Sequence, residues 1–291
     1  MSHTAQAPSD GTRPVAVVTG ASSGLGAAYA RALGQRGHEL VLVARRRKRL
    51  EIMAAEAAVK HGVTAEILPA DLSDPGELAR VVERVQSLPN LQFLVNAAGF
   101  GLHGAFSAAD VERELEMIRL HVVASVRLAH AALPAMLRRR DGAIVNVASL
   151  GAFVPLPGFA TYGATKAYMV SFCRSLAIEL EGTGVRVQAL CPGFTRTEFQ
   201  NRQGADLSLV PKFMWMSPEQ VIDGSLQALE RNQVVCVPGF LNRMAVRLAG
   251  PLGGHIQRRV AAHNGWRTPS DAQQEGRDAA APESQAVDRV R

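Results

Sequence analysis

Two side chains suited to proton transfer lie four residues apart in the segment Tyr162-Gly163-Ala164-Thr165-Lys166. In a helix, that spacing stacks the phenol and the ammonium on one face, one above the other. A free phenol has a pKa of about 10 and is a poor base near neutral pH. Because a cationic neighbour favours the phenolate, we expect Lys166 to lower the pKa of Tyr162 and so to prepare it for acid–base work.

A serine is expected to join this pair. Ser149 follows an apolar run at 143–147 that is typical of a buried strand. Ligands of parallel α/β sheets bind beyond the carboxyl ends of the strands, so Ser149 is placed at the site. Its hydroxyl could hold a substrate oxygen on which charge develops. The three side chains therefore predict proton exchange with a substrate oxygen.

A glycine-rich turn follows the first apolar run, 15–18, and precedes a helix-like stretch. Glycines there permit a tight turn and a close approach to a pyrophosphate, which the N–H groups of the next helix would bind. A glycine-rich stretch alone says little, but its place between a first strand and a first helix predicts dinucleotide binding. The expected contacts are Gly20, Ser22, Ser23, Gly24, Leu25 and Gly26.

The end of the second run, 39–43, indicates which dinucleotide is bound. An acidic residue at this point binds a ribose 2′-hydroxyl, whereas arginine accommodates a 2′-phosphate. This chain has Arg45 and Arg46 there and no carboxylate. Their planar, multi-donor guanidinium groups suit a phosphate, so NADP(H) is the expected cofactor. The next three basic residues, 47–49, are expected to be solvated only.

Apolar runs and helix-like stretches alternate along the chain, which is typical of a parallel sheet covered on both faces. Helical spacing is clearest over 112–137 and 162–180, and Ser217-Pro218-Glu219-Gln220 is typical of a helix start. The expected fold is a Rossmann-like three-layer α/β/α sandwich with a seven-stranded parallel sheet. Its strands are expected at 15–18, 39–43, 65–68, 93–95, 143–147, 185–190 and 234–237.

Composition excludes several classes of protein. With 47% hydrophobic residues among 291, the chain is not mainly disordered. Its three cysteines are widely spaced, which argues against a disulfide framework or a cysteine-rich metal site and favours a reducing compartment. We see no secretory signal and no apolar run of about 18 residues, so a cytoplasmic protein is expected. The net charge of +6 comes without a nucleic-acid-binding motif, and the cluster 138–140 is expected to be a solvated helix face.

In order and spacing, these motifs resemble the short-chain dehydrogenase/reductase family, in its compact single-domain branch. The resemblance covers residues 13–238 and implies the strand order 3-2-1-4-5-6-7 and a homodimer or homotetramer. It implies that Asp71 and Leu72 flank the adenine and that Asn96 braces the fourth strand beside the cofactor. The motifs are Thr19–Gly26, Asp71, Asn96-Ala97-Ala98-Gly99, Ser149, Tyr162 with Lys166, and 191–197. Further implied cofactor contacts are Ala97, Gly99, Tyr162, Lys166, Pro192, Gly193, Thr195 and Thr197.

The sequence departs from the family pattern at two points. Ala97 replaces a usual Asn, which we expect to change little. His121 stands where the family has an Asn that supports a water-linked proton path to the lysine. Its imidazole could replace that Asn by hydrogen bonding and titrate near neutral pH. Alternatively His121 is structural and the relay runs through a backbone carbonyl.

The substrate side is expected to be apolar. In this family the segment after the sixth strand, about 194–217 here, forms a substrate lid, and it is rich in large apolar residues. Such a lining suits a bulky apolar ketone, aldehyde or alcohol, although half of these side chains could simply be core. The candidate substrate contacts are Phe153, Phe159 and Phe194.

The expected domain organisation is a tail over 1–12, a catalytic domain over 13–239, a basic helical extension over 240–267 and a disordered tail over 268–291. The extension packs on its own domain or a sister subunit, or its residues 240–262 touch an anionic membrane. The sequence thus predicts an NADP(H)-dependent oxidoreductase that interconverts a carbonyl and an alcohol. The alternative is a non-catalytic dinucleotide-binding protein with a regulatory or scaffold role.

Overall fold

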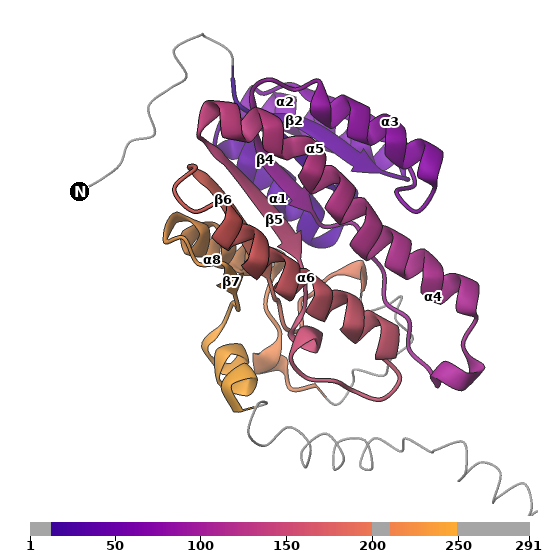
Figure 1. The fold of residues 1–291 in the computed structure, drawn as a ribbon. Helices are drawn as coiled ribbons and strands as arrows, with labels where there is room; N and C mark the ends of the chain where they lie inside the picture. The colour runs from indigo at the N-terminus through magenta and orange to yellow at the C-terminus, as the bar shows by residue number, and fades with distance from the viewer. Residues whose placement is uncertain (1–12, 200–209, 249–291) are drawn as a thin grey trace, which may run out of the picture.

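A computed structural model describes residues 13–199 and 210–248. Seven parallel strands form one sheet in the order β3-β2-β1-β4-β5-β6-β7, as the sequence predicted (Figure 1). Strand order reverses at β1, between its neighbours β2 and β4, which is where ligands bind in such sheets. The strands are β1 Val15–Thr19, β2 Glu39–Ala44, β3 Ala65–Pro69, β4 Leu91–Asn96, β5 Gly142–Val147, β6 Val185–Leu190 and β7 Val235–Cys236.

Helices cover both faces of this sheet. Side chains alternate along each strand, so Val15 and Val17 of β1 pack into one core while Ala16 and Val18 pack into the other. The first core lies under α3, α5 and α6, on the near side of Figure 1, and the second under α1, α2 and α8. These helices are α1 Gly24–Gln35, α2 Arg47–His61, α3 Pro75–Gln86, α5 Ala124–Arg139, α6 Ala160–Glu179 and α8 Pro218–Glu230.

The helix starts follow local sequence signals. Ser217 caps α8 with the reciprocal capping box that its sequence predicted, in which Gln220 returns a hydrogen bond to the Ser217 backbone. Asp74 caps α3 and accepts from the Glu77 amide. Three short 3₁₀ turns complete the connections, at Phe106–Ala108, Leu150–Ala152 and Lys212–Met214.

The helical run predicted at 112–137 extends over Val111–Arg139 and is not uniform. It consists of α4 (Val111–Ile118), one π-helical turn (Arg119–Val123) and α5. This run is long and apolar enough to cross a membrane by length and composition alone, which the sequence analysis did not predict. Half of its apolar window is buried, and α5 lies against the central strands β4 and β5. We therefore assign it as a core helix of the domain.

The C-terminal extension begins as a helix over 240–248. Its Asn242 is buried and donates to the Pro238 carbonyl at 2.7 Å. A Cβ on Gly193 would lie 2.7 Å from that amide, so the first turn of the helix packs against the loop after β6. The predicted tails and the rest of the extension lie outside the described residues.

Candidate active site

A cavity of about 1080 Å³ lies at the carboxyl ends of the strands. The structure brings most of the predicted site residues together around it, although they come from distant parts of the chain. Of the predicted residues, the cavity wall contains Gly20, Ser22, Ser23, Gly24, Leu25, Gly26, Arg45, Arg46, Asp71, Leu72, Ala97, Gly99, Ser149, Phe159, Tyr162, Lys166, Pro192, Gly193, Phe194, Thr195 and Thr197.

Three predicted site residues do not line this cavity. Asn96 is buried behind it and donates to Asn146 Oδ1 at 2.9 Å, which ties β4 to β5 as the bracing role requires. Phe153 is partly buried and packs against the core cluster that contains residues of α6. His121 is also buried behind the wall. Sequence spacing could not separate these three from the wall residues, because it does not show which way a side chain faces in the folded chain.

Tyr162, Lys166 and Ser149 are adjacent. Lys166 Nζ lies 5.6 Å from the centre of the Tyr162 ring and donates to the Val147 carbonyl at 2.9 Å. Ser149 and Tyr162 are joined by a side-chain hydrogen bond. The Ser149 hydroxyl also accepts from the Gly151 amide at 3.1 Å, which orients it. The helix that carries Tyr162 and Lys166 and the strand end that carries Ser149 therefore bring the three side chains together, as the sequence predicted.

The electrostatics differ from the sequence expectation. Burial raises the pKa of Tyr162 to about 12, and the hydrogen bond with Ser149 only partly opposes this. Burial lowers the pKa of Lys166 to about 8. Desolvation disfavours whichever form is charged, so it acts in opposite directions on a phenol and an ammonium. The structure therefore does not show the expected lowering of the Tyr162 pKa by Lys166, and the Tyr162 phenol is neutral at pH 7.

The glycine turn is packed so tightly that two of its positions have no space for a side chain. Gly20 has φ +66°, and a Cβ there would lie 2.8 Å from the Ala97 carbonyl oxygen. A Cβ on Gly26 would lie 2.3 Å from the Gly20 carbonyl oxygen. Thr19 fastens the turn to the loop after β4, because its hydroxyl accepts from the Ala97 and Ala98 amides at 3.0 and 3.1 Å.

The two arginines after β2 have different surroundings. Arg45 is exposed and pairs with Asp71 at 3.3 Å. Arg46 reaches back to the glycine turn, where it donates to the Ser23 hydroxyl at 2.7 Å and to the Ser22 hydroxyl at 2.9 Å. Arg46 therefore lies closer than Arg45 to the phosphate-binding turn.

The sequence analysis did not predict the carboxylate that pairs with these arginines. Glu198 lines the cavity and pairs with Arg46 at 3.0 Å and with Arg49. Arg49 is thus not merely solvated, as had been expected. Glu198 lies about 150 residues from both arginines, so no local pattern could reveal the contact.

His121 lies on the π-helical turn between α4 and α5 and is almost fully buried. Its Nε2 accepts from the Phe100 amide at 3.3 Å, so Nδ1 carries the proton and donates to the Thr165 hydroxyl at 3.0 Å. That hydroxyl in turn donates to the Tyr162 carbonyl at 2.8 Å. The imidazole therefore connects the loop after β4 to the helix that carries Tyr162. These contacts favour the structural alternative for His121.

The same contacts predict an acid-sensitive stability. Burial, with the nearby charge of Lys166, holds the pKa of His121 well below its usual range. As pH falls below about 6.5, the unfolded chain gains a proton that the folded chain does not, so the stabilisation present above that pH is lost. We expect His121→Asn to reduce the pH dependence of the unfolding free energy by up to about 1.4 kcal/mol per pH unit below pH 6.5. Urea denaturation between pH 5 and 7.5 measures this, and equal slopes for both proteins would contradict it.

The described part of the chain shows no candidate metal site. Within 13–199 and 210–248, no group of three or more His, Cys, Asp or Glu side chains is arranged to hold a metal ion. The three cysteines are all buried thiols.

The sheet order, the glycine turn and the Ser–Tyr–Lys set define a dinucleotide-binding α/β oxidoreductase. Residues 14–208 match the family model described as short chain dehydrogenase. The chain therefore belongs to the short-chain dehydrogenase/reductase family. The resemblance seen in the sequence is confirmed.

Two relatives illustrate the range of this family. An uncharacterized oxidoreductase of Staphylococcus epidermidis is 36% identical over 184 residues, which are 63% of this chain and 78% of that protein. Inactive hydroxysteroid dehydrogenase-like protein 1 of Homo sapiens is 30% identical over 205 residues, which are 70% of this chain and 61% of that protein.

Two solved structures share the fold over nearly the whole chain. A short-chain dehydrogenase from Sphingobium yanoikuyae in complex with NADPH has a TM-score of 0.74 and 35% identity, covering 95% of this chain and 100% of that one. The bulky-bulky ketone specific alcohol dehydrogenase from Comamonas testosteroni has a TM-score of 0.70 and 30% identity, covering 95% and 98%.

Proposed function

We propose that this protein is an NADP(H)-dependent oxidoreductase that interconverts a bulky apolar ketone or aldehyde with the corresponding alcohol. One observation carries the proposal: a single cavity joins the glycine turn and Arg46 to the hydroxyl groups of Ser149 and Tyr162. An anion-binding end and a proton-donating end in one cavity are what a phosphorylated hydride carrier and an oxygen-bearing substrate require.

The residues present fit a nicotinamide dinucleotide. Glycine at positions 20 and 26 lets the turn close on itself and on the loop after β4, because a Cβ at either position would meet backbone atoms. Such a tight turn before a helix is typical of a pyrophosphate-binding loop. Ser23, the N-cap of α1, makes no side-chain capping hydrogen bond within the described helix, so the first amides of α1 remain available to an anion. Asp71 and Leu72, which follow β3, line the cavity next to Arg45, where the adenine is expected.

The proposed chemistry divides the work between cofactor and protein. A nicotinamide dinucleotide held by the glycine turn would, when bound, supply the hydride for reduction or accept it in oxidation. In reduction, the hydroxyl groups of Ser149 and Tyr162 both donate to the carbonyl oxygen, and Tyr162 transfers its proton to that oxygen as the alcohol forms. The buried cation of Lys166 then lies beside the phenolate left behind and stabilises it. Oxidation reverses these steps.

The substrate preference is proposed from the apolar wall beside Tyr162. Phe159 packs 6.2 Å from the Tyr162 ring and Phe199 packs 6.1 Å from it, measured between ring centres. Such a wall favours large apolar groups on the carbonyl, with few polar groups to orient them. The similar alcohol dehydrogenase from Comamonas testosteroni is specific for bulky-bulky ketones, which supports this proposal. The other apolar wall residues on this side are Phe100, Leu120, Val154, Leu156, Phe194, Val210 and Met214.

The experiment that tests the reaction is NADPH consumption over a panel of ketones and aldehydes of graded bulk. We expect turnover to increase with apolar bulk on both sides of the carbonyl. If NADPH binds but no member of the panel is reduced, the non-catalytic dinucleotide-binding alternative replaces the proposal.

Cofactor choice has its own test. We expect Arg46→Ala to weaken NADPH binding about 10- to 100-fold, since hydrogen bonds between charged groups contribute about 1.5–3 kcal/mol. NADH binding should change little, because a ribose 2′-hydroxyl carries no charge for Arg46 to pair with. Fluorescence titration of both cofactors measures the two dissociation constants. Arg47→Ala is the matched control, since Arg47 is exposed on the first turn of α2 and does not line the cavity. An equal loss for both cofactors would show that Arg46 does not select the 2′-phosphate.

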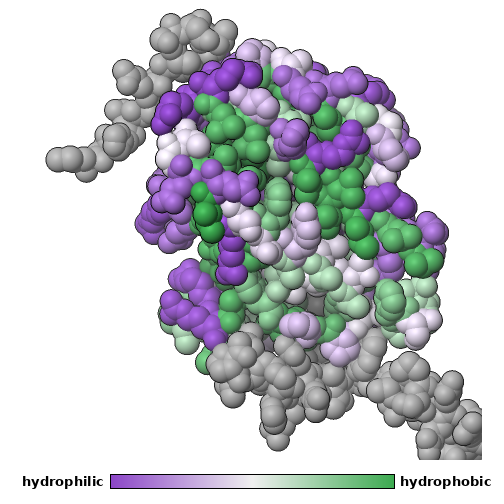
Figure 2. All heavy atoms as spheres, viewed as in Figure 1, coloured by the Kyte–Doolittle hydropathy of each residue, from purple (hydrophilic) through white to green (hydrophobic). Residues whose placement is uncertain are grey.

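We also propose a homodimer or homotetramer. Apolar side chains gather on the face formed by α4, α5 and α6 (Figure 2). Among them Leu115, Val123 and Tyr168 are at least 40% exposed, and Ile178 is 74% exposed. Exposed apolar side chains gathered on one face are typical of a protein–protein contact.

The proposed location is the cytoplasm, with no nucleic-acid partner. Peripheral membrane contact through 240–262 is kept as a secondary proposal. Phe240 and Leu241 at the start of that segment are 67% and 50% exposed. Asn242, in contrast, holds this first turn against its own domain.

A further inference from the structure

One carboxylate lies where the arginine cluster meets the cofactor cavity. Glu198 Oε2 accepts from Arg46 Nη1 at 3.0 Å, and Glu198 Oε1 accepts from Arg49 Nη1. The other guanidinium donors of Arg46 are held by the Ser22 and Ser23 hydroxyl groups of the glycine turn. The guanidinium is therefore fixed at the turn, with its remaining edge turned to Glu198.

A carboxylate and a phosphate monoester seek the same donors. Both present a pair of oxygen atoms to which arginine can donate with paired N–H groups. The edge of Arg46 that Glu198 occupies is therefore an edge that an incoming phosphate also requires. The two anions compete for it, since they also repel each other when close together.

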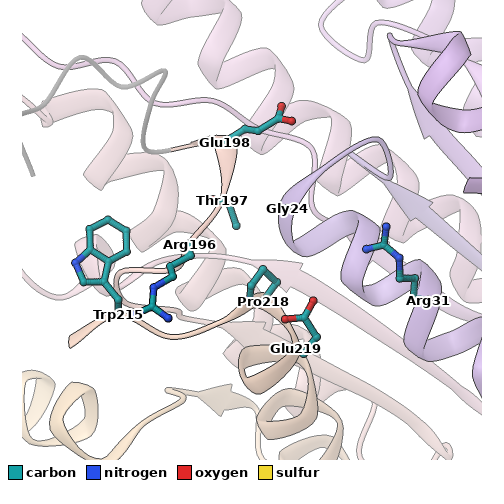
Figure 3. Close-up of a pocket in the computed structure, with 8 residues that line it drawn as sticks. All are labelled: Gly24, Arg31, Arg196, Thr197, Glu198, Trp215, Pro218 and Glu219. Atoms are coloured by element: carbon teal, nitrogen blue, oxygen red, sulfur yellow. The ribbon is translucent and has the colours of Figure 1, made fainter. Parts of the chain in front are cut away.

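Residues 197–199 form part of the cavity wall. Thr197 lies against the glycine turn, because a Cβ on Gly24 would be 3.3 Å from its methyl group (Figure 3). Phe199, on the other side of Glu198, packs 6.1 Å from the Tyr162 ring. The three residues 197–199 therefore reach from the phosphate-binding end to the catalytic end. Glu198, the middle residue of this stretch, is anchored by Arg46 and Arg49.

We propose that Glu198 is an internal competitor for the 2′-phosphate of the cofactor, and that its ion pairs with Arg46 and Arg49 hold residues 197–199 in their place on the cavity wall until that phosphate displaces Glu198. The inference rests on the proposed preference for NADP(H). Glu198 would then be a specificity-determining residue, because its competition lowers the affinity of the site for ligands with a 2′-phosphate. It also couples occupation of the phosphate end to release of Phe199 from Tyr162.

The expected effect is a modest change in affinity. Ion pairs between exposed side chains stabilise weakly, so removing this competitor is expected to tighten binding by about three- to tenfold. The probe is adenosine 2′,5′-bisphosphate, which carries the phosphate but no nicotinamide, compared with 5′-AMP, which lacks the 2′-phosphate. Isothermal titration of the full chain should show tighter binding of the bisphosphate to Glu198→Gln and unchanged binding of 5′-AMP.

Two variants separate displacement of a contact from simple charge repulsion. Glu198→Asp keeps the charge but is one methylene shorter, so it cannot reach both arginines and should also bind the bisphosphate more tightly. Glu219→Gln removes an equal charge from the same hollow, at the first turn of α8, and should bind like the wild type (Figure 3). Tighter binding by Glu198→Gln with wild-type binding by Glu198→Asp would show repulsion alone and would overturn the proposal.

Hydrogen exchange gives the second measurement. The bisphosphate should speed amide exchange over 194–199 in the wild type, whereas 5′-AMP should not, and in Glu198→Gln this exchange should be fast without ligand. Weaker bisphosphate binding by Glu198→Gln would mean that Glu198 orients Arg46 for the phosphate, which also overturns the proposal. A wild-type protein that binds the bisphosphate no better than 5′-AMP, with Arg46→Ala unchanged, would instead refute the NADP(H) preference.

Discussion

Tyr162→Phe is expected to lower turnover with NADPH and an apolar ketone by about 10²- to 10⁴-fold, the usual contribution of a positioned proton donor. The substitution removes only the hydroxyl that meets Ser149. Its ring would keep the contacts with His121 and Phe159, whose ring centres lie 6.0 and 6.2 Å away. Folding and NADPH binding should therefore be nearly unchanged, so the loss should fall on kcat.

The measurement is steady-state kinetics beside a fluorescence titration of NADPH. Tyr168→Phe is the matched control, because Tyr168 lies on the same helix, is 43% exposed and is not in the cavity wall. It should behave like the wild type. If Tyr162→Phe keeps full turnover on a substrate that the wild type reduces, Tyr162 is not the proton donor.

The second large effect combines a loss of activity with a gain in stability. Lys166→Met should reduce turnover about 10²-fold or more, because the phenolate formed at Tyr162 loses its adjacent cation. At pH 7 the same change should raise the free energy of unfolding by about 2 kcal/mol. Burial lowers the pKa of Lys166 from 10.5 to about 8, which corresponds to a penalty of about 3 kcal/mol on the folded cation. Loss of the hydrogen bond to the Val147 carbonyl offsets about 1 kcal/mol of that gain.

The pH dependence gives this prediction its sign. Below about pH 8 the lysine is charged in both folded and unfolded chains, so the whole penalty is present. Between pH 8 and 10.5 the folded protein loses this proton while the unfolded chain keeps it, so the wild type recovers stability. The advantage of Lys166→Met should therefore shrink across that interval.

Urea denaturation at pH 7 and pH 9.5 measures the change. Lys48→Met controls for the removal of a lysine from the surface, since Lys48 is exposed on α2. A Lys166→Met protein that is less stable than the wild type at pH 7 would show that burial of this ammonium is compensated in the folded state.

Most local features of this protein were predictable from the sequence, although the π-helical turn at Arg119–Val123 was not. The apolar runs marked the seven strands to within two residues at either end, because a buried parallel strand needs a continuous apolar stretch. The capping box at Ser217 and the glycines at Gly20 and Gly26 followed from short-range hydrogen bonding and backbone geometry. The four-residue spacing of Tyr162 and Lys166 was enough to place both on one face of α6.

Other features were decided only by the tertiary structure, because they depend on burial and on contacts between distant residues. The pKa of Tyr162 rises rather than falls, since desolvation by the folded chain outweighs the local helical partner. The choice between relay and support at His121 depended on Phe100 and Thr165, which approach it only when three separate elements pack together. Glu198 reaches Arg46 across 152 residues, and no spacing rule spans that distance. Sequence periodicity determines which elements form and which face is buried, whereas the charge state and partners of a buried group are set by everything that packs around it.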